Sequence, residues 1–394
     1  MNYQFSRRSF FQITTAVAFT QMLQGCSQSQ AALEILFLAN SIPIQLIGDF
    51  RKAISPENKV DFNPQTQLEQ IFNSLLKINR DKQPKPNNNN PLKEIFNKSK
   101  APPEIMSLGD FWLSSAIEQN LLQPLAINSL DNWQKLPERW QKLALRDRLG
   151  NVTANGQIYG APYRWGSTVI AYRSDKLDEL KLTITDWQDL WQPEFRDRLS
   201  LLDSPREVIG LTLKKLGHSY NTDNLDTVAD LKRELSALHQ QVKFYSSDRY
   251  LEPLILGDTW AAVGWSTDIL PLLKRYPKIE FAIPQSGTSL WADLWVKPQS
   301  SKASDENNNI LYIGDRWIDF CWSDKSAKQI SLFTDGLSPI LLSMKSEELP
   351  QDLQGNVFLD RETVDWDRSE FLLPQTPATQ KQYRDLWQKI RNEG

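Results

Sequence analysis

Residues 33–38 read LEILFL, an apolar run of strand length, and they open the part of the chain that decides the fold class. Helices and strands alternate after it, with apolar residues at helical spacing in the helices. The pattern predicts helix 43–54, strand 59–62, helix 66–77, strand 105–108 and helix 111–120. This alternation is typical of a parallel, doubly wound sheet, so we expect an α/β fold.

The second half of the chain continues with strands and helices from about residue 159. Its strands are predicted at 169–172, 199–202, 259–265 and 289–296. Its helices are predicted at 186–191, from 204, at 224–239, through 275, at 316–333 and at 376–391. At 394 residues, the chain is long enough for two compact units.

Composition excludes several classes of function. The formal charge is −3, from 45 Lys+Arg against 48 Asp+Glu, so no basic surplus is available to bind nucleic acid. Two cysteines, Cys26 and Cys321, and two histidines, His218 and His239, are too few for a disulfide framework or a Cys- or His-rich metal site. Phosphate-binding, dinucleotide-binding and nucleophile-elbow motifs are absent from the sequence. We therefore expect no cofactor, no metal and no enzymatic activity.

The N-terminus is predicted to be an export signal. Arg7 and Arg8 precede a mostly apolar stretch at 13–23, which is too short to span a membrane. The segment SRRSFF resembles a twin-arginine motif, and LQGC at 23–26 resembles a lipobox. Residues 1–25 are thus the predicted signal peptide and Cys26 the predicted lipidation site. A spare thiol after an ordinary cleavage site is the alternative.

Several sequence blocks together resemble a known family. They are YGAPYRWGST (159–168), WQDLWQPE (187–194), REV (206–208) before LG (216–217), YSSD (245–248) and WAD (291–293). In order and spacing they are similar to the bacterial periplasmic spermidine/putrescine-binding proteins of ABC importers. The resemblance implies a two-lobe α/β fold, each lobe a sheet flanked by helices, with crossing hinge segments. We expect lobe 1 to comprise 33–168 plus 292–340, and lobe 2 to comprise 169–291 plus 341–394.

This resemblance also implies a role and partners. The chain would be the extracytoplasmic solute-binding component of an ABC importer, expected to be a periplasmic monomer. It would bind a polyamine between its lobes and dock on the permease subunits, with membrane contact only through a lipid anchor. Carboxylates would pair with the ammonium groups, and Trp faces would hold the cationic stem by cation–π contacts worth about 0.5–2 kcal/mol each.

Six positions match the ligand-binding residues of the family. They are Ser107, Glu207, Ser247, Trp265, Trp291 and Asp293. Each also has a purely structural alternative. Asp293 could point to solvent, Glu207 could complete a capping box with Ser204, and the two tryptophans could belong to the core. Ser247 could hold a turn, and Ser107 could cap the helix that follows it.

Other positions depart from the family pattern. Leu38 and Ala39 stand where the family has Trp and Thr, and Gly109 stands where it has an aromatic residue, although Phe111 and Trp112 lie near. Ser204 replaces an acid, with Asp203 beside it. One carboxylate and two aromatic side chains of the expected cage are therefore missing, which leaves the identity of the ligand open.

Two other hypotheses stay open at this point. The same fold could bind a neutral or anionic solute, and Arg164 or Arg206 pointing into the cleft would favour an anion. Alternatively, the chain could be an extracytoplasmic enzyme or assembly factor on this scaffold, which turnover of a small substrate or a large exposed apolar patch would support.

Overall fold

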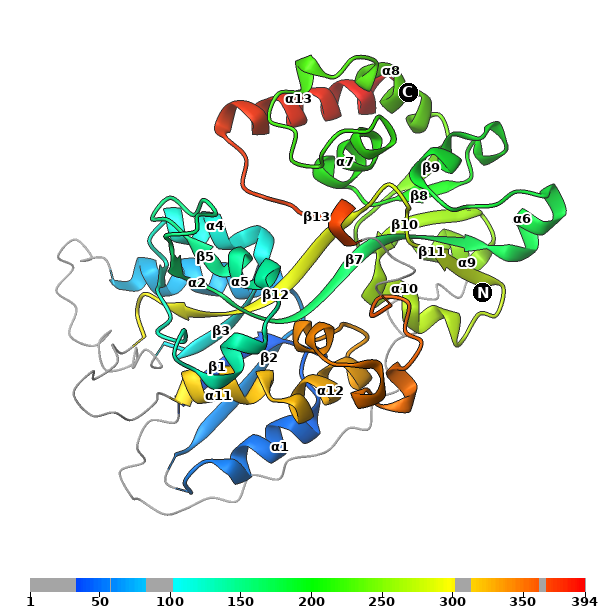
Figure 1. Cartoon of the computed structure of the whole chain (residues 1–394). Coiled ribbons are helices and arrows are strands. Elements are labelled where there is room, and N and C mark those ends of the chain that lie inside the picture. The colour runs from blue at the N-terminus through cyan, green and yellow to red at the C-terminus, as the bar shows by residue number, and fades with distance from the viewer. Residues whose placement is uncertain (1–32, 57, 83–101, 302–312, 361–365, 394) are drawn as a thin grey trace, which may run out of the picture.

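The computed structural model of the protein describes residues 33–56, 58–82, 102–301, 313–360 and 366–393 (Figure 1). The predicted signal peptide, with Arg7, Arg8 and Cys26, lies outside these residues. The strands are β1 (Leu33–Leu38), β2 (Val60–Gln65), β3 (Ile105–Gly109), β4 (Leu122–Gln123), β5 (Leu145–Arg146), β6 (Gln157–Ile158), β7 (Ala161–Arg173), β8 (Leu199–Leu201), β9 (Val242–Tyr245), β10 (Ala261–Trp265), β11 (Ile279–Ala282), β12 (Ser289–Pro298) and β13 (Glu370–Phe371). The α-helices are α1 (Ile44–Ala53), α2 (Leu68–Lys82), α4 (Asp110–Glu118), α5 (Glu138–Ala144), α6 (Ser174–Leu180), α7 (Pro205–Lys215), α8 (Leu231–His239), α9 (Glu252–Leu256), α10 (Ser266–Leu273), α11 (Ile313–Trp322), α12 (Asp324–Phe333) and α13 (Pro377–Asn392).

Two long neighbouring strands connect the two halves of the molecule. The strand order is β2-β1-β3-β12-β7-β10-β8-β9, with β1 parallel to both β2 and β3. Strand β12 runs antiparallel to β3 and to β7, and β7 runs antiparallel to β10. In Figure 1, β7 and β12 extend from the lower left part, which holds β1–β3, to the upper right part, which holds β8–β11. The prediction of an α/β fold with crossing segments is confirmed.

Each half has helices against its part of the sheet. Helices α1, α11 and α12 pack beside β1–β3, and α7, α8 and α13 pack together over the strands of the other half (Figure 1). Large aromatic side chains fill the interior of the first half, where Phe50 meets Trp317 edge to face at 4.9 Å. A second core lies between α7, α8, α13 and β8, and includes Trp187 and Trp387.

The predicted lobe boundaries remain a prediction. The sheet is continuous through β12 and β7, so no single residue divides it. A further backbone pairing lies beside these strands, since Trp165 and Leu337 exchange backbone hydrogen bonds of 2.8 and 3.0 Å. The two lobes are therefore joined by paired backbone.

Three predicted elements differ in extent from those in the structure. The predicted strand 169–172 is the end of the 13-residue β7. The predicted helix 224–239 begins as α8 only at Leu231, because Asp230 has φ 65°, which interrupts helical geometry. The predicted helix 316–333 is two helices, divided at Ser323, whose side chain caps α12.

None of the helices in the described part of the chain has the length and apolar composition needed to cross a membrane.

Candidate functional site

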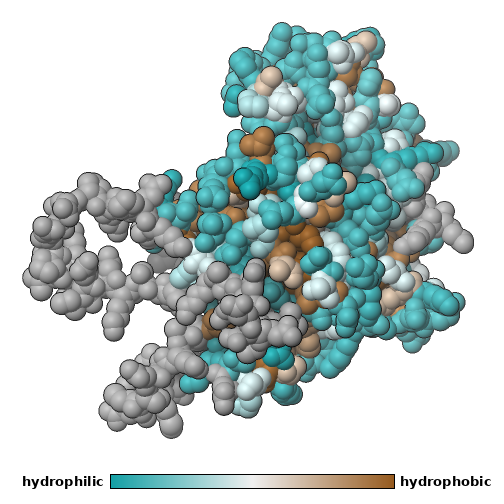
Figure 2. Space-filling view, turned by 60° about the vertical axis from the view of Figure 1, so that its left-hand side comes forward, coloured by the Kyte–Doolittle hydropathy of each residue, from teal (hydrophilic) through white to brown (hydrophobic). Residues whose placement is uncertain are grey.

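The candidate site lies where β7 and β12 run side by side between the lobes. Trp291 stands directly opposite Gly166 in the strand register, and Asp293 stands opposite Arg164. Side chains two residues apart on a strand point to one face, so Trp291 and Asp293 share a face with Arg164. Figure 2 shows hydrophobic side chains at the surface in the middle of the molecule, below the part built by α7, α8 and α13. The strand pairing therefore gathers a carboxylate, a guanidinium and an indole ring at one place.

Arg164 and Asp293 form a buried ion pair. Arg164 Nε donates to Asp293 Oδ2 at 2.8 Å, and the side chains are only 9% and 3% exposed. Burial raises the pKa of Asp293, and the charge and hydrogen bond of Arg164 oppose that rise. A buried pair of this kind is costly to break, because either charge left alone would lack compensation.

The guanidinium of Arg164 has further partners. Its Nη1 donates to the carbonyl of Thr334 at 3.3 Å, and its Cζ lies 5.6 Å from the centre of the Trp291 ring. A Cβ at Gly336 would lie 2.7 Å from Arg164 Cγ, so the arginine stem packs directly on the glycine backbone. These contacts form a fitted socket for one cation.

Gly166 allows Trp291 to lie against the neighbouring strand. A Cβ there would lie 2.4 Å from Trp291 Cζ2 and 2.6 Å from Ser266 Oγ. Ser266 is the first residue of α10, and its hydroxyl accepts from the backbone N–H of Ser167 at 3.2 Å. The start of α10 is thus fixed beside Trp291.

A second group of residues adjoins this point at the end of β10. The hydroxyl of Tyr250 accepts from the backbone N–H of Trp265 at 3.0 Å and donates to Asp268 Oδ2 at 2.9 Å. Trp265 is half-buried and Asp268 is exposed. Desolvation by neighbouring protein raises the pKa of Asp268, while Tyr250 and the charge of Arg164 lower it. The carboxyl group of Asp268 is thus accessible to solvent and at the same time partly desolvated by the protein around it.

Glu207 reaches the same two strands from α7. It is 7% exposed, and its Oε2 accepts from Ser289 Oγ at 2.7 Å, with Thr168 as a further partner. Burial raises its pKa. The capping box considered from the sequence is not formed, because Ser204 makes no side-chain cap hydrogen bond. A ligand role for Glu207 remains a prediction.

The two predicted serines have different surroundings. Ser107 is fully buried, and its hydroxyl lies 3.0 Å from that of Tyr163, which also contacts Ser41 at 2.8 Å. It does not cap α4, whose N-cap is Gly109. Ser247 is half-buried in a turn, and that turn is held by Ser246, whose hydroxyl accepts from the N–H groups of residues 248 and 249. Ligand roles for both serines remain predictions.

The positions that depart from the family pattern lie as follows. Leu38 and Ala39 are half-buried at the end of β1. Gly109 pairs with Asp293 in the sheet. Phe111, two residues further on, is 59% exposed, so an aromatic ring lies near the position where the family has an aromatic residue and this chain has Gly109. Asp203 is engaged elsewhere by Arg391, at 3.0 Å.

Arg206 does not contribute to this site. Its Nη2 donates to Asn221 Oδ1 at 3.0 Å and to the carbonyl of Leu373 at 3.2 Å, and its guanidinium lies over the Tyr383 ring. Of the two arginines considered from the sequence, only Arg164 lies beside Asp293. Sequence reasoning missed Tyr250 and Asp268. The helix predicted after strand 259–265 already placed Asp268 in a first helical turn, three positions after Trp265.

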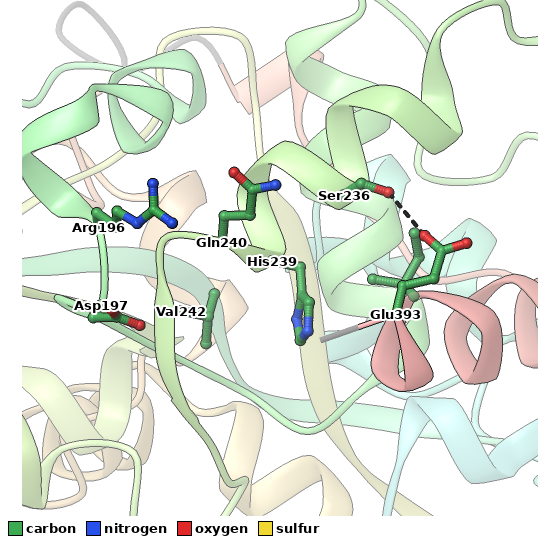
Figure 3. A pocket seen from close by; sticks show the side chains of 8 residues that line it. Arg196, Asp197, Ser236, His239, Gln240, Val242 and Glu393 are labelled. Carbon is green, nitrogen blue, oxygen red and sulfur yellow. Dashed lines mark hydrogen bonds between the residues drawn. The ribbon is translucent and has the colours of Figure 1, made fainter.

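A polar pocket of about 390 Å³ lies apart from this site, among residues near the ends of α8 and α13 (Figure 3). His239 lines it and makes a 3.0 Å contact with the Tyr245 hydroxyl, while Ser236 donates to Glu393 at 3.3 Å. Burial lowers the pKa of His239. In the described ranges no cluster of three or more His, Cys, Asp or Glu could hold a metal ion.

Comparison with known proteins identifies the family. The sequence profile of the bacterial extracellular solute-binding proteins matches residues 101–369. The chain belongs to this family. An extracytoplasmic location agrees with the membership, whereas the lipid anchor remains a prediction.

Curated relatives of this solute-binding protein include polyamine-binding proteins, as the sequence blocks predicted. It is 33% identical over 144 residues to the spermidine/putrescine-binding periplasmic protein of Salmonella typhimurium. The matched region covers 36% of this chain and 41% of that protein. It is 24% identical over 286 residues to the Escherichia coli protein of the same description, which covers 71% and 75% of the two chains. The chain thus spans less than half the length of the Salmonella relative.

Solved structures confirm the two-lobe fold. PotD of Streptococcus pneumoniae, a spermidine/putrescine ABC transporter substrate-binding protein, has a TM-score of 0.72 at 20% identity, covering 91% of this chain and 98% of that one. A putative spermidine/putrescine ABC transporter protein of Listeria monocytogenes has a TM-score of 0.64 at 23% identity, covering 92% and 99%. At these identities the likeness concerns the fold.

Proposed function

We propose that this chain is the solute-binding component of an ABC importer and takes a small amine of the polyamine class between its lobes. One observation carries the proposal: Trp265, Trp291 and the exposed carboxylate of Asp268 lie together beside the crossing of β7 and β12. Aromatic faces and a carboxylate are the groups that bind an alkylammonium ion. The named relatives bind spermidine and putrescine, which supports the same class here.

Binding would favour the closed arrangement of the lobes. Trp265, Asp268 and Trp291 all belong to the predicted lobe 2, whereas Phe111, 59% exposed in α4, belongs to the predicted lobe 1. A ligand that contacts residues of both lobes at once binds the closed state more tightly than the open one, and therefore shifts the population toward it. The closed form would then dock on the permease subunits.

The alternative of an anionic ligand has one observation in its favour, since Arg164 lies at the site. Its charge is balanced by Asp293 at 2.8 Å, and Asp268 adds a second carboxylate nearby. The site as a whole is therefore negative, which favours a cation over an anion.

A thermal-shift panel tests the proposed function. We expect putrescine, N-acetylputrescine or spermidine to raise the melting temperature, since a ligand that binds only the native state stabilises it, and glutamate and glucose to leave it unchanged. Trp265→Leu should reduce the shift in melting temperature. Trp260→Leu is the matched control, because Trp260 lies beside Arg198 just before the other end of β10, and it should leave the shift unchanged. A shift with glutamate alone, or with none of these solutes, would contradict the proposal.

The export and anchoring predictions have a separate test. Cells that produce the chain with Cys26→Ala should release it from the membrane fraction, while wild type stays there. Equal distribution of both forms would exclude lipidation at Cys26.

A further inference from the structure

We propose that Arg164 is a resident cation that occupies one of the ammonium positions of the cleft, so that the site takes a solute with one ammonium group and a neutral hydrogen-bond acceptor in place of a diamine. This inference rests on the proposed function, because it concerns which amine the same site selects. It gives Arg164 a role in specificity.

The contacts of Arg164 are those that a bound ammonium group would need. Its guanidinium has a carboxylate partner in Asp293 at 2.8 Å and an aromatic face in Trp291 at 5.6 Å. The carbonyl of Thr334 and the bare backbone of Gly336 complete the socket. A ligand ammonium at this place would have to displace a buried arginine that is already paired, which is unfavourable.

Of the other carboxylates near the site, one is accessible to an ammonium group of a ligand. Asp110 accepts from the backbone N–H of Ala292, and Glu207 accepts from the hydroxyl of Ser289. Both are buried. Asp268 is exposed at the site, and its hydrogen bond comes from the neutral hydroxyl of Tyr250. Asp268 is therefore the carboxylate that an incoming ammonium group can reach.

The other end of the ligand would face Arg164. Nε and Nη1 of Arg164 are bound to Asp293 and Thr334, which leaves Nη2 without an acceptor among the residues described. A second ammonium group would be repelled there, whereas an amide carbonyl could accept from Nη2. An N-acylated diamine has this combination: a primary ammonium at one end and a neutral acceptor at the other.

Isothermal titration calorimetry of the purified mature protein with putrescine and N-acetylputrescine tests the proposal, because the two share one carbon chain. We expect wild type to bind N-acetylputrescine at least tenfold more tightly than putrescine. Arg164→Met should reverse the order, since Asp293 then lacks a cation and the second ammonium of putrescine can supply it. Arg198→Met, an equal charge change at a half-buried arginine beside Trp260, should keep the wild-type order.

The double variant Arg164→Met/Asp293→Asn removes both charges, so no lone buried carboxylate remains. It should bind N-acetylputrescine and gain no affinity for putrescine. If wild type binds putrescine as tightly as N-acetylputrescine, or more tightly, the role of Arg164 is overturned and the proposed function stays intact. This comparison uses wild type alone, so it does not depend on the folding of any variant. Binding of neither amine, by wild type or by Arg164→Met, would overturn both.

Discussion

The carboxylate of Asp110 accepts a hydrogen bond from the backbone N–H of Ala292 at 3.1 Å, and so joins the first residue of α4 to β12 beside the candidate site. Burial raises the pKa of Asp110 to about 7, and the charge of Asp293 adds to the rise. The hydrogen bond from Ala292 and the charge of Arg146 oppose it. Asp110 therefore changes its charge near neutral pH in the folded protein.

Replacing Asp110 with Asn should flatten part of the pH dependence of stability. The folded protein holds this proton up to about pH 7, whereas the unfolded chain releases it near pH 3.9. The stabilisation is complete below about pH 4 and is lost as the pH rises through 7. Urea unfolding should therefore show Asp110→Asn gaining roughly 1–4 kcal/mol relative to wild type between pH 4 and pH 8. A constant difference across this range would refute the assignment.

Gly166→Ala should damage the site through packing. The added methyl group would lie 2.4 Å from the Trp291 ring, so either the ring or the strand must shift. We expect a loss of about 1–3 kcal/mol in the free energy of unfolding, with weaker amine binding. Gly48→Ala in α1 is the matched control, because nothing lies within 4 Å of its added methyl group. Equal melting temperatures for the two variants would contradict the packing described.

Asp268→Asn should weaken amine binding while leaving the fold unchanged. Asparagine can still accept from the Tyr250 hydroxyl, but the charge that pairs with an ammonium group is lost. Charged hydrogen bonds contribute about 1.5–3 kcal/mol, which corresponds to roughly a 10- to 100-fold loss of affinity in calorimetry. Asp258→Asn, on an exposed turn, serves as the control. Unchanged affinity in the Asp268 variant would remove this residue from the site.

Glu207→Gln distinguishes a structural from a ligand role. Two hydroxyl groups contact this carboxyl group, that of Ser289 on β12 and that of Thr168 on β7. We expect the variant to lose about 1–3 kcal/mol of stability, since an amide N–H₂ would meet groups arranged around an acceptor. Amine affinity should change less than threefold. A large loss of affinity with an unchanged melting temperature would instead place Glu207 in the ligand site.

Local patterns in the sequence predicted most of the strands. The strands at 33–38 and 105–108 were predicted to within one residue of the observed β1 and β3, because each is a short apolar run with clear ends. The predicted helix 224–239 was too long. Its polar start fits a helix by composition, but the left-handed backbone at Asp230 depends on how the turn packs.

The site was harder to predict than the fold. Resemblance to a family indicated Trp291 and Asp293, whereas the partner of Asp293 depends on the register of strands whose paired residues are 129 positions apart. Arg164 was considered from the sequence as a sign of an anionic ligand. Only the paired strands show that its charge is balanced by Asp293, so Arg164 by itself does not indicate an anionic ligand.

The pairing of β7 with β12 affects how the lobes would move. A joint made of flexible loops would let them swing freely, but here the two strands are paired on both sides of one register shift, between Asp293 and Leu294, with the Trp165–Leu337 bridge beside them. Movement of the lobes would then twist this pair of strands, at an energy that grows with amplitude. We expect such a joint to act as a weak spring that limits the opening angle.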